Sequence, residues 1–554
     1  MMHADKYKPG YFPVPPQYNT WVQKDHLEKP PIWCSVDMRD GNQSLTVPMS
    51  LSEKLTFFKV LVDIGFKEIE VGFPAASETE YEFLRTLIEK NLIPADVTIQ
   101  VLTPCRPHII EKTFEACKGA KNIIIHFYNS LSRVQREQVF QMPEEEIKKI
   151  AVEGAKYIKK TASLYGGNFR FEYSPESFTG TEPEYALEVC NAVLDILEPA
   201  SENPVIINLP VTVELSMPHV YAAQVEYMHT HLKYRENVIL SVHPHNDRGT
   251  GVADAELALL AGAQRIEGTL FGNGERTGNA DIITLAMNLY SHGIDPCLDF
   301  SDMPRLVENY KKCTRMQVYS RAPYAGDFVF AAFSGSHQDA IAKGLRYREE
   351  HALKHWCVPY MPIDPHDINR TYNMDVIRFN SQSGKGGIGY LLEETYGYVL
   401  PNGMREHLSY LCKDIADREH RELKAPEVLS IFKETYLMLS SPLSVSDMHF
   451  HRKDNTVELT ITFLENGRET TIKSNGNGSL DAISNALKSY KKTEYLLEVY
   501  TEHSMQEKGS GSMAVSYIGI KGKDNKMYWG AGMDTDIIHA STTALLHAFQ
   551  NMEA

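Results

Sequence analysis

The segment His243-Pro-His245-Asn-Asp247 carries the side chains with the most evident chemistry in this chain. It follows the apolar run 238–242, whose β-branched residues predict a buried strand. Because side chains alternate along a strand, His243 and His245 should leave it on the same face. Two imidazoles on one face provide half of a divalent-metal site, although a hydrogen-bonded polar pair has the same pattern.

A carboxylate that could complete such a site is Asp40, which follows the apolar run 33–39. One carboxylate and two imidazoles leave coordination positions open for substrate and water. Asp40 could equally be a turn residue before Gly41. Arg39 beside it could stabilise an oxyanion or enolate, or it could pair with a carboxylate of a neighbouring strand such as Glu70.

The elements that position these residues repeat along the first half of the chain. Eight apolar strand-like runs alternate with amphipathic helical patterns, at 33–39, 67–73, 97–103, 122–128, 169–173, 205–209, 238–243 and 265–271. This alternation predicts a (β/α)8 barrel, in which active sites lie at the carboxyl ends of the strands. Asp40 and the histidine pair would then meet at one mouth of the barrel.

Other polar residues that follow the predicted strands are candidates for the same site. Glu176 could act as a general base, and Thr212 could hold a substrate carboxylate. The glycine-containing loop 272–279 follows the last run, and we expect its Asn279 to point at the metal site. A solvated loop Glu and a capping Thr are the simpler interpretations of the first two.

The remaining sequence predicts a helical connection and a small α+β domain. The expected divisions are an N-terminal extension (1–30), the barrel (31–305), helical linker subdomains (306–435) and a C-terminal domain of two βββα repeats (436–554). Gly530-Ala-Gly532 precedes the second predicted helix of that domain. A glycine turn at a helix N-terminus can receive a carboxylate, or it can be a simple turn.

Composition excludes several classes of function. The 554 residues carry a net charge of −16 and no block of basic residues, which argues against a nucleic-acid or anionic-membrane partner. No run approaches the ~18 apolar residues of a membrane helix, and no signal or transit peptide is evident. The eight cysteines are scattered without a C-x-x-C pair, as expected for a disulfide-free cytoplasmic protein.

Two of these motifs resemble the signatures of the 2-isopropylmalate/homocitrate synthase family. Met38-Arg-Asp-Gly-Asn-Gln43, followed by Lys54, resembles the first signature, with Met38 where the family usually has Leu. His243-Pro-His-Asn-Asp-Arg-Gly249 resembles the second. The likeness extends through 174–182, 208–210, 271–279, 335–339, 359–364 and 380–387, and the C-terminal domain is similar to the family's leucine-sensing domain.

The resemblance implies a Claisen-type condensation of acetyl-CoA with 3-methyl-2-oxobutanoate (2-oxoisovalerate), giving 2-isopropylmalate and CoA in leucine synthesis. It implies a divalent cation (Mg²⁺, Zn²⁺ or Mn²⁺), a domain-swapped homodimer and feedback inhibition by leucine. The implied metal ligands are Asp40, His243 and His245, with Asn279 in or beside the shell. Arg39 would face the enolate and Thr212 the substrate carboxylate, while Leu102, His126, Ser174 and Asn208 would shape the pocket. The implied proton acceptors are Glu176 with His337 and Tyr360 of the partner subunit, and the implied leucine contacts are Gly530, Gly532 and Asp534.

Three alternatives remain open at this point. A homocitrate or citramalate synthase would share both signatures and accept a different 2-oxo acid. A metal-dependent hydrolase would place its H-x-H pair on the first strand of a barrel, whereas here the pair follows the seventh. A non-catalytic amino-acid sensor would use only the C-terminal repeat, but it would not need Arg39, Asp40 and the two histidines together.

Overall fold

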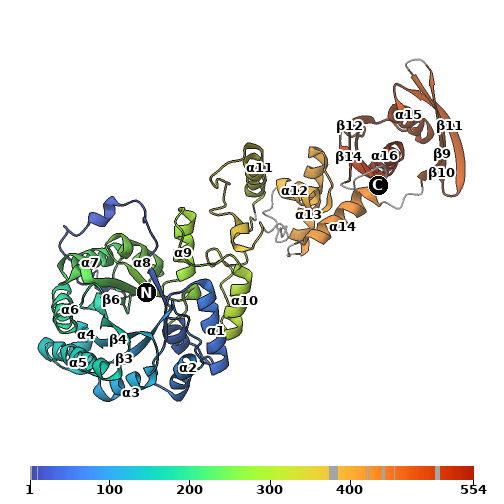
Figure 1. Cartoon of the computed structure of the whole chain (residues 1–554). Helices are drawn as coiled ribbons and strands as arrows, with labels where there is room; N and C mark the ends of the chain where they lie inside the picture. Colours follow the sequence, from blue (N-terminus) through green and yellow to red (C-terminus); the bar gives the residue numbers. More distant parts are fainter. Residues whose placement is uncertain are drawn as a thin grey trace. The chain divides into compact units, whose positions relative to one another are not determined.

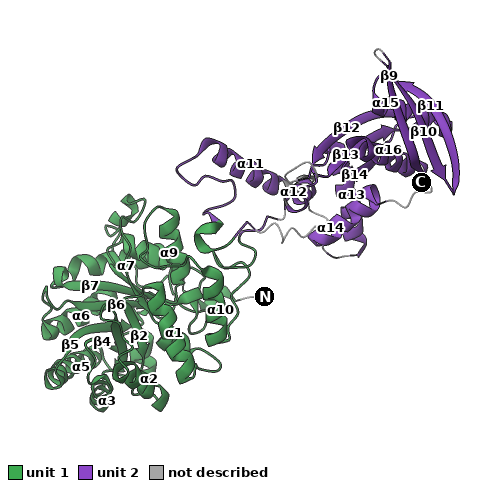
Figure 2. Cartoon of the chain, turned by 45° about the vertical axis from the view of Figure 1, so that its right-hand side comes forward, with its two compact units in different colours: residues 1–329, 365–370 green, residues 330–364, 371–554 purple. Residues whose placement is uncertain are grey.

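The computed structural model describes residues 3–8, 10–332, 334–372, 385–419, 421, 423–438, 443–453, 456–505 and 512–554 (Figure 1). Residues 380–384 of the family-like motif 380–387 lie outside these ranges. The chain forms two compact units, 1–329 with 365–370 and 330–364 with 371–554 (Figure 2).

The first unit contains a closed barrel of eight strands in chain order. All strand pairs in it are parallel, and β1 pairs with β8 to close the ring. The strands are β1 (Ile32–Ser35), β2 (Glu68–Gly72), β3 (Thr98–Pro104), β4 (Asn122–Ser130), β5 (Asn168–Glu176), β6 (Val205–Val211), β7 (Val238–Pro244) and β8 (Arg265–Gly268). The predicted (β/α)8 barrel is confirmed.

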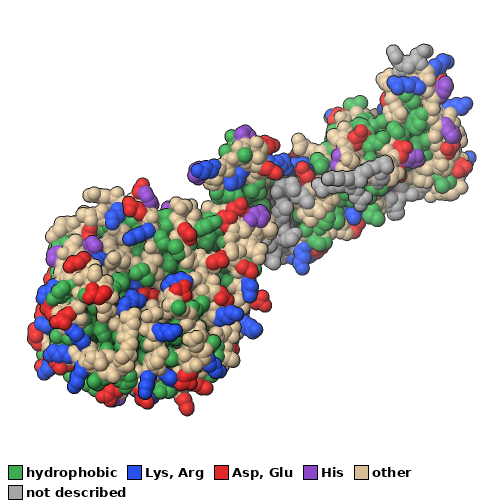
Figure 3. All heavy atoms as spheres, viewed as in Figure 1, with side chains coloured by type: hydrophobic (Ala, Val, Ile, Leu, Met, Phe, Trp, Pro, Cys, Tyr) green, Lys and Arg blue, Asp and Glu red, His purple; other side chains and the backbone are tan. Residues whose placement is uncertain are grey.

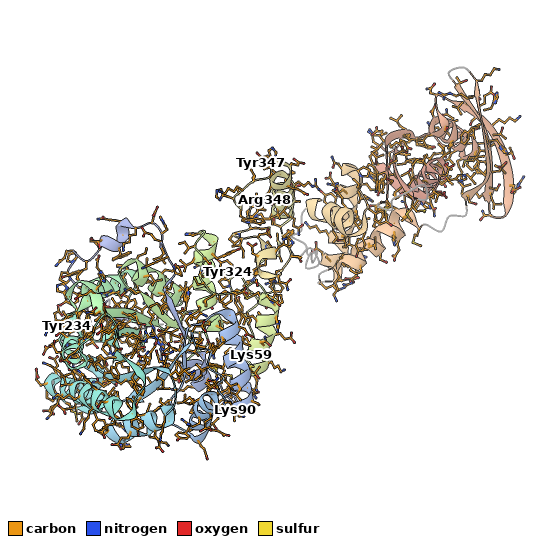
Figure 4. All side chains as sticks on the ribbon, in the orientation of Figure 1. Lys59, Lys90, Tyr234, Tyr324, Tyr347 and Arg348 are labelled. Carbon is orange, nitrogen blue, oxygen red and sulfur yellow. The ribbon has the colours of Figure 1, made fainter. Side chains whose placement is uncertain are left out.

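Helices surround the strands on the outside of the barrel (Figure 1). They are α1 (Leu51–Ile64), α2 (Glu78–Glu89), α3 (Pro107–Cys117), α4 (Arg133–Gln135), α5 (Glu144–Tyr165), α6 (Pro183–Leu197), α7 (Pro218–His231), α8 (Gly251–Leu260), α9 (Ile282–Ser291) and α10 (Met303–Thr314). Helix α1 begins at a capping box of Ser50 and Glu53 and ends at Gly65, whose φ of 112° suits a glycine C-cap. Side chains fill the interior of the ring, so the barrel is a packed core and not a pore (Figure 4).

The first strand is shorter than its apolar pattern predicts. It pairs with β8 only as far as Ser35, and the backbone then forms a π-helical turn, Asp37–Gly41. The N–H of Gly41 donates to the carbonyl of Val36 (3.1 Å), and the Asp37 carboxylate accepts from the N–H of Leu270 (3.1 Å). Asp40 therefore lies in a tight turn beyond the strand. In this turn the backbone forms local hydrogen bonds and does not continue the pairing with β8.

The second unit begins with helices and ends in an α+β domain. The helices are α11 (Gly335–His351), α12 (Lys385–Tyr396), α13 (Asn402–Glu419) and α14 (Ala425–Phe432). Two βββα repeats follow, made of β9 (Leu443–Lys453), β10 (Thr456–Glu465), β11 (Arg468–Gly476) and α15 (Ser479–Lys491), then β12 (Leu496–Ser504), β13 (Ala514–Lys521), β14 (Met527–Asp534) and α16 (Ile537–Glu553). The predicted doubled repeat is confirmed.

The prediction of a glycine turn immediately before the last helix is wrong. Gly530 and Gly532 lie inside β14, paired with β13, and the N-cap of α16 is Asp536. A Cβ on Gly530 would lie 2.2 Å from the backbone nitrogen of Ala548, and one on Gly532 would lie 2.1 Å from the carbonyl oxygen of Ala540. The two glycines are needed because the strand and helix α16 pack backbone against backbone.

The molecular surface carries charges of both signs. Basic and acidic side chains are interspersed over the face of the barrel unit in view (Figure 3). Among the described residues, no helix combines the length and apolar character needed to cross a membrane. The cysteines are free thiols.

Candidate active site

A cavity of about 330 Å³ lies at the carboxyl ends of the barrel strands. It is lined by Arg39, Asp40, Gln43, Leu102, His126, Tyr128, Ser174, Glu176, Asn208, Pro210, Thr212, His243, His245, Glu275 and Arg276. Every candidate that the sequence places on the barrel belongs to this lining, except Asn279. The fold thus brings together residues that are more than 200 positions apart in the sequence.

Three of the lining residues present potential metal ligands to one another. The ligand atoms of Asp40, His243 and His245 all lie within 4.8 Å of one another, and the three side chains are buried. The imidazole centroids are 5.3 Å apart, as two histidines on one strand face should be. Asn279 joins them, since its Nδ2 donates to Asp40 (2.6 Å) and its Oδ1 lies 2.8 Å from His243 Nε2.

The surroundings of the two imidazoles fit a cation-binding role. His243 Nδ1 lies 2.8 Å from the buried carboxylate of Glu267, a partner that fixes the ring and leaves Nε2 facing Asn279. His245 Nδ1 is buried and has no hydrogen-bond partner among the described residues. A buried, unpartnered imidazole nitrogen beside a carboxylate matches the donor set of a divalent transition-metal site.

The surrounding charges favour an anionic Asp40 and a neutral His245 at neutral pH. Burial alone would raise the pKa of Asp40, but the Arg39 guanidinium and the two imidazoles outweigh it and bring the pKa to about 2. Burial and the neighbouring His243 lower the pKa of His245 to about 4. One anionic carboxylate and one neutral imidazole are the protonation states that metal coordination requires.

Arg39 forms ion pairs with two carboxylates, those of Asp40 and Glu70. Its Nε donates to Glu70 (2.6 Å), and its Nη1 donates to Asp40 (2.7 Å). The predicted ion pair with Glu70 is therefore present in the same side chain that lines the cavity. A guanidinium has five N–H donors, so these two bonds leave others for an anionic oxygen in the cavity.

A chain of hydrogen bonds runs from Glu70 along one wall of the cavity. Its Oε1 lies 2.8 Å from His126 Nδ1, and His126 Nε2 lies 2.8 Å from Ser174 Oγ. Asn208 Nδ2 donates to the same hydroxyl (3.0 Å). The chain holds His126, Ser174 and Asn208 in fixed orientations.

Glu176 and Thr212 also line the cavity, Glu176 at the end of β5 and Thr212 immediately after β6. Burial raises the pKa of Glu176, and the Arg39 guanidinium offsets part of that effect. Thr212 Oγ1 accepts from the N–H of Ser177 (2.9 Å), which joins the ends of β5 and β6. Thr212 does not cap the helix that follows it, since the N-cap of α7 is Met217. The hydroxyl hydrogen of Thr212 stays available to a ligand in the cavity.

Known protein families and individual proteins match this chain over nearly its whole length. Residues 30–309 match the HMGL-like family, 327–393 the alpha-isopropylmalate synthase post-catalytic domain-like family, and 422–553 the LeuA allosteric (dimerisation) domain. A 2-isopropylmalate synthase of Desulfitobacterium hafniense is 58% identical over 100% of this chain and 99% of its own length. One of Helicobacter hepaticus is also 58% identical, over 100% of both chains, and one of Clostridium acetobutylicum is 51% identical, over 95% and 96%. The chain belongs to the 2-isopropylmalate synthase family.

Two residues that the family resemblance adds to the site lie in the second unit. His337 and Tyr360 stack with ring centroids 4.0 Å apart, and Tyr360 is 63% exposed. The barrel cavity belongs to the first unit, so these two rings come from a different part of the chain. Their participation stays a prediction.

A layer of buried charged side chains lies beneath the site and is not among the residues predicted from the sequence. Arg265 is fully buried and donates to Glu68 (2.6 Å) and Glu267 (3.0 Å), and Glu267 in turn supports His243. The available signal was charge inside apolar strand patterns, as in Lys67-Glu-Ile-Glu-Val71 and Arg265-Ile-Glu267. Such charges in a strand that is otherwise buried must pair inside the barrel.

The loop that follows His245 is held by the buried carboxylate of Glu214. Glu214 accepts hydrogen bonds from the N–H of Arg248 and the hydroxyl of Thr250. Asp254 lies beside it, 1% exposed, and burial together with the Glu214 carboxylate raises the pKa of Asp254 to about 8. Asp254 therefore holds a proton in the folded protein at neutral pH.

Replacing Asp254 with asparagine should flatten the pH dependence of stability. Because the folded protein binds a proton that the unfolded chain releases above the ordinary value of 3.8, stability should fall as pH rises from there to about 8. Asp254→Asn should remove that fall, and Tm measured from pH 5 to 9 checks it. Asp63→Asn, at an exposed position of α1, is the control. If Asp254→Asn kept the parent's slope of Tm against pH, the raised pKa of Asp254 would be contradicted.

Proposed function

We propose that this chain condenses acetyl-CoA with 3-methyl-2-oxobutanoate to give (2S)-2-isopropylmalate and CoA, the first step of leucine synthesis. The observation that carries the proposal is a single cavity in which Arg39 lies against the buried set of Asp40, His243 and His245. In a chain that resembles 2-isopropylmalate synthases over its full length, that arrangement suits an acyltransferase that adds an enolate to a 2-oxo acid. Free cysteines suit a cytoplasmic location.

The proposed metal ligands are Asp40, His243 and His245, with Asn279 at the edge of the shell. Bound there, Mg²⁺, Zn²⁺ or Mn²⁺ would polarise the keto group of the oxo acid and make its C2 electrophilic. Glu267 orients the His243 ring from the far side of the site.

The other cavity residues bind and orient the two substrates in this proposal. Thr212 donates its hydroxyl to the carboxylate of the oxo acid, and Arg39 stabilises the enolate oxygen that forms on acetyl-CoA. The pocket for the branched side chain is formed by Leu102, His126, Ser174 and Asn208. Ser174 Oγ joins His126 and Asn208 by hydrogen bonds within the wall, which lowers the cost of facing an isopropyl group.

Proton transfer from the acetyl methyl group is assigned to Glu176 together with His337 and Tyr360 of the partner subunit. The raised pKa of Glu176 moves it toward the range in which a carboxyl group exchanges protons at neutral pH. The assignment of His337 and Tyr360 rests on family resemblance and on their position outside the barrel unit.

The C-terminal domain is proposed to join two chains and to bind leucine. The match to the LeuA allosteric (dimerisation) domain supports a homodimer regulated by a small molecule. Gly530, Gly532 and Asp534 are the proposed leucine contacts. This assignment rests on the resemblance, since β14 offers no glycine turn there.

An assay of CoA release with a panel of 2-oxo acids tests the proposal. We expect 3-methyl-2-oxobutanoate to give a kcat/KM at least ~10-fold above that of pyruvate, because an isopropyl-sized pocket gains about 1–3 kcal/mol from the added methyl groups. The same assay with leucine should show inhibition. Faster turnover of pyruvate would make the chain a citramalate synthase, and faster turnover of 2-oxoglutarate would make it a homocitrate synthase.

A further inference from the structure

Lys54 of helix α1 is buried completely, which is unusual for a lysine. Its Nζ forms an ion pair with Glu80 of helix α2 and lies 5.1 Å from the centroid of the Phe83 ring. Lys54 is absent from the lining of the barrel cavity, so it does not touch the space proposed for substrates. A buried charge that stays out of the cavity requires another explanation.

The ammonium group of Lys54 also reaches the turn that carries Arg39 and Asp40. Its Nζ lies 3.3 Å from the carbonyl oxygen of Met38, the residue immediately before Arg39. This bond crosses from helix α1 to the π-helical turn Asp37–Gly41.

Glu80 extends the same contact to the far end of the turn. Its Oε1 accepts from Asn42 Nδ2 (3.5 Å), and Asn42 Oδ1 in turn accepts from the N–H of Met49 (2.7 Å). The Lys54–Glu80 pair therefore contacts the chain on both sides of Arg39 and Asp40.

The end of strand β2 leaves room for the Glu80 side chain. A Cβ on Gly72 would lie 1.9 Å from Glu80 Oε2, so any larger residue would displace the carboxylate. Oε2 itself is buried without a hydrogen-bond partner among the described residues, which makes Glu80 depend on Lys54 for its compensation.

We propose that Lys54 and Glu80 are positioning residues that hold the turn Asp37–Gly41 in the conformation that aims Arg39 and Asp40 into the cavity. The inference rests on the proposed function and deepens it, because the turn lies beyond the last paired residue of β1. A strand end is fixed by its ladder of backbone bonds, whereas this turn is fixed by side chains packed behind it.

The test measures the site in the metal-free protein and in the presence of Mn²⁺. Lys54→Met removes the cation at similar volume, Glu80→Gln removes the anion, and the double variant removes both charges. In Lys54→Met we expect faster amide exchange over 37–42 without Mn²⁺, and ~10- to 100-fold weaker Mn²⁺ binding in competition with a chelator. The double variant should regain Tm relative to Lys54→Met, because no charge is left unpaired, but it should not regain the Mn²⁺ affinity.

A matched control separates positioning from general stability. Arg136, the first residue of the π-helical turn Arg136–Phe140 after α4, is a similarly buried cation that pairs with Glu182 (2.7 Å). Arg136→Met should lower Tm while leaving exchange over 37–42 and Mn²⁺ affinity within twofold of the parent. The inference is overturned if Lys54→Met, like Arg136→Met, leaves amide exchange over 37–42 and Mn²⁺ affinity within twofold of the parent. If Lys54→Met does not fold, Glu80→Gln is compared with Arg136→Met in the same two measurements. These readouts need no turnover, so a failure of the proposed condensation leaves them interpretable.

Discussion

His245→Ala is expected to lower kcat by ~10³-fold or more, and chelation of the parent enzyme should have the same effect. The loss of several kcal/mol of charge stabilisation at the keto oxygen accounts for a change of this size. His245 should be the more informative of the two histidines, because its buried Nδ1 has no hydrogen-bond partner to lose in the part of the chain that the structure describes. His243→Ala would also leave the Glu267 carboxylate without its imidazole.

The measurement is CoA release with and without added Mn²⁺, together with metal content of the purified protein. His292→Ala, at an exposed position after helix α9, is the matched control and should keep the parent kcat and metal content. A His245→Ala variant that retains both metal and more than a tenth of the parent kcat would remove His245 from the ligand set.

The barrel and the meeting of Asp40 with the two histidines could be predicted from the sequence because both depend on local patterns. Alternating apolar runs define the strands, and a strand order that follows the chain places the ends of β1, β7 and β8 side by side. The period of two along β7 then places His243 and His245 on one face.

What could not be predicted depends on contacts between segments distant in the sequence. The end of β1 at Ser35 is decided by a bond from the N–H of Leu270 to Asp37, and no pattern near residue 35 reveals it. The glycines at 530 and 532 look like turn residues locally, and only the approach of α16 shows that they are packing residues in a strand. The charges of Arg265 and Glu172 interrupt apolar runs, but the sequence does not say which charge faces which.

Arg265→Met should be the most destabilising substitution in the barrel, costing about 3–5 kcal/mol of unfolding free energy. Arg265 is fully buried and contacts Glu68 (2.6 Å), Gln100 Oε1 (2.7 Å) and Glu267 (3.0 Å). Without its guanidinium, the buried carboxylates of Glu68 and Glu267 would lose the cation that they share, and Glu68 would keep only its ion pair with Arg170. Urea denaturation of the barrel unit within the full chain, followed by tryptophan fluorescence, measures the loss.

Glu172→Gln in the same layer should behave in the opposite way. Burial raises the pKa of Glu172 well above its ordinary value, beyond what the attraction of Arg265 can offset, and both carboxyl oxygens lack a hydrogen-bond partner among the described residues. The folded protein therefore binds this proton more tightly than the unfolded chain does, so stability should fall as the pH rises above the ordinary carboxyl range. Glutamine has the same shape without that linkage, so Glu172→Gln should match the parent near pH 5 and exceed it near pH 8. Glu172→Gln could instead be as destabilising as Arg265→Met at pH 8. Glu172 would then be an ionised partner of Arg265, which contradicts the raised pKa of Glu172.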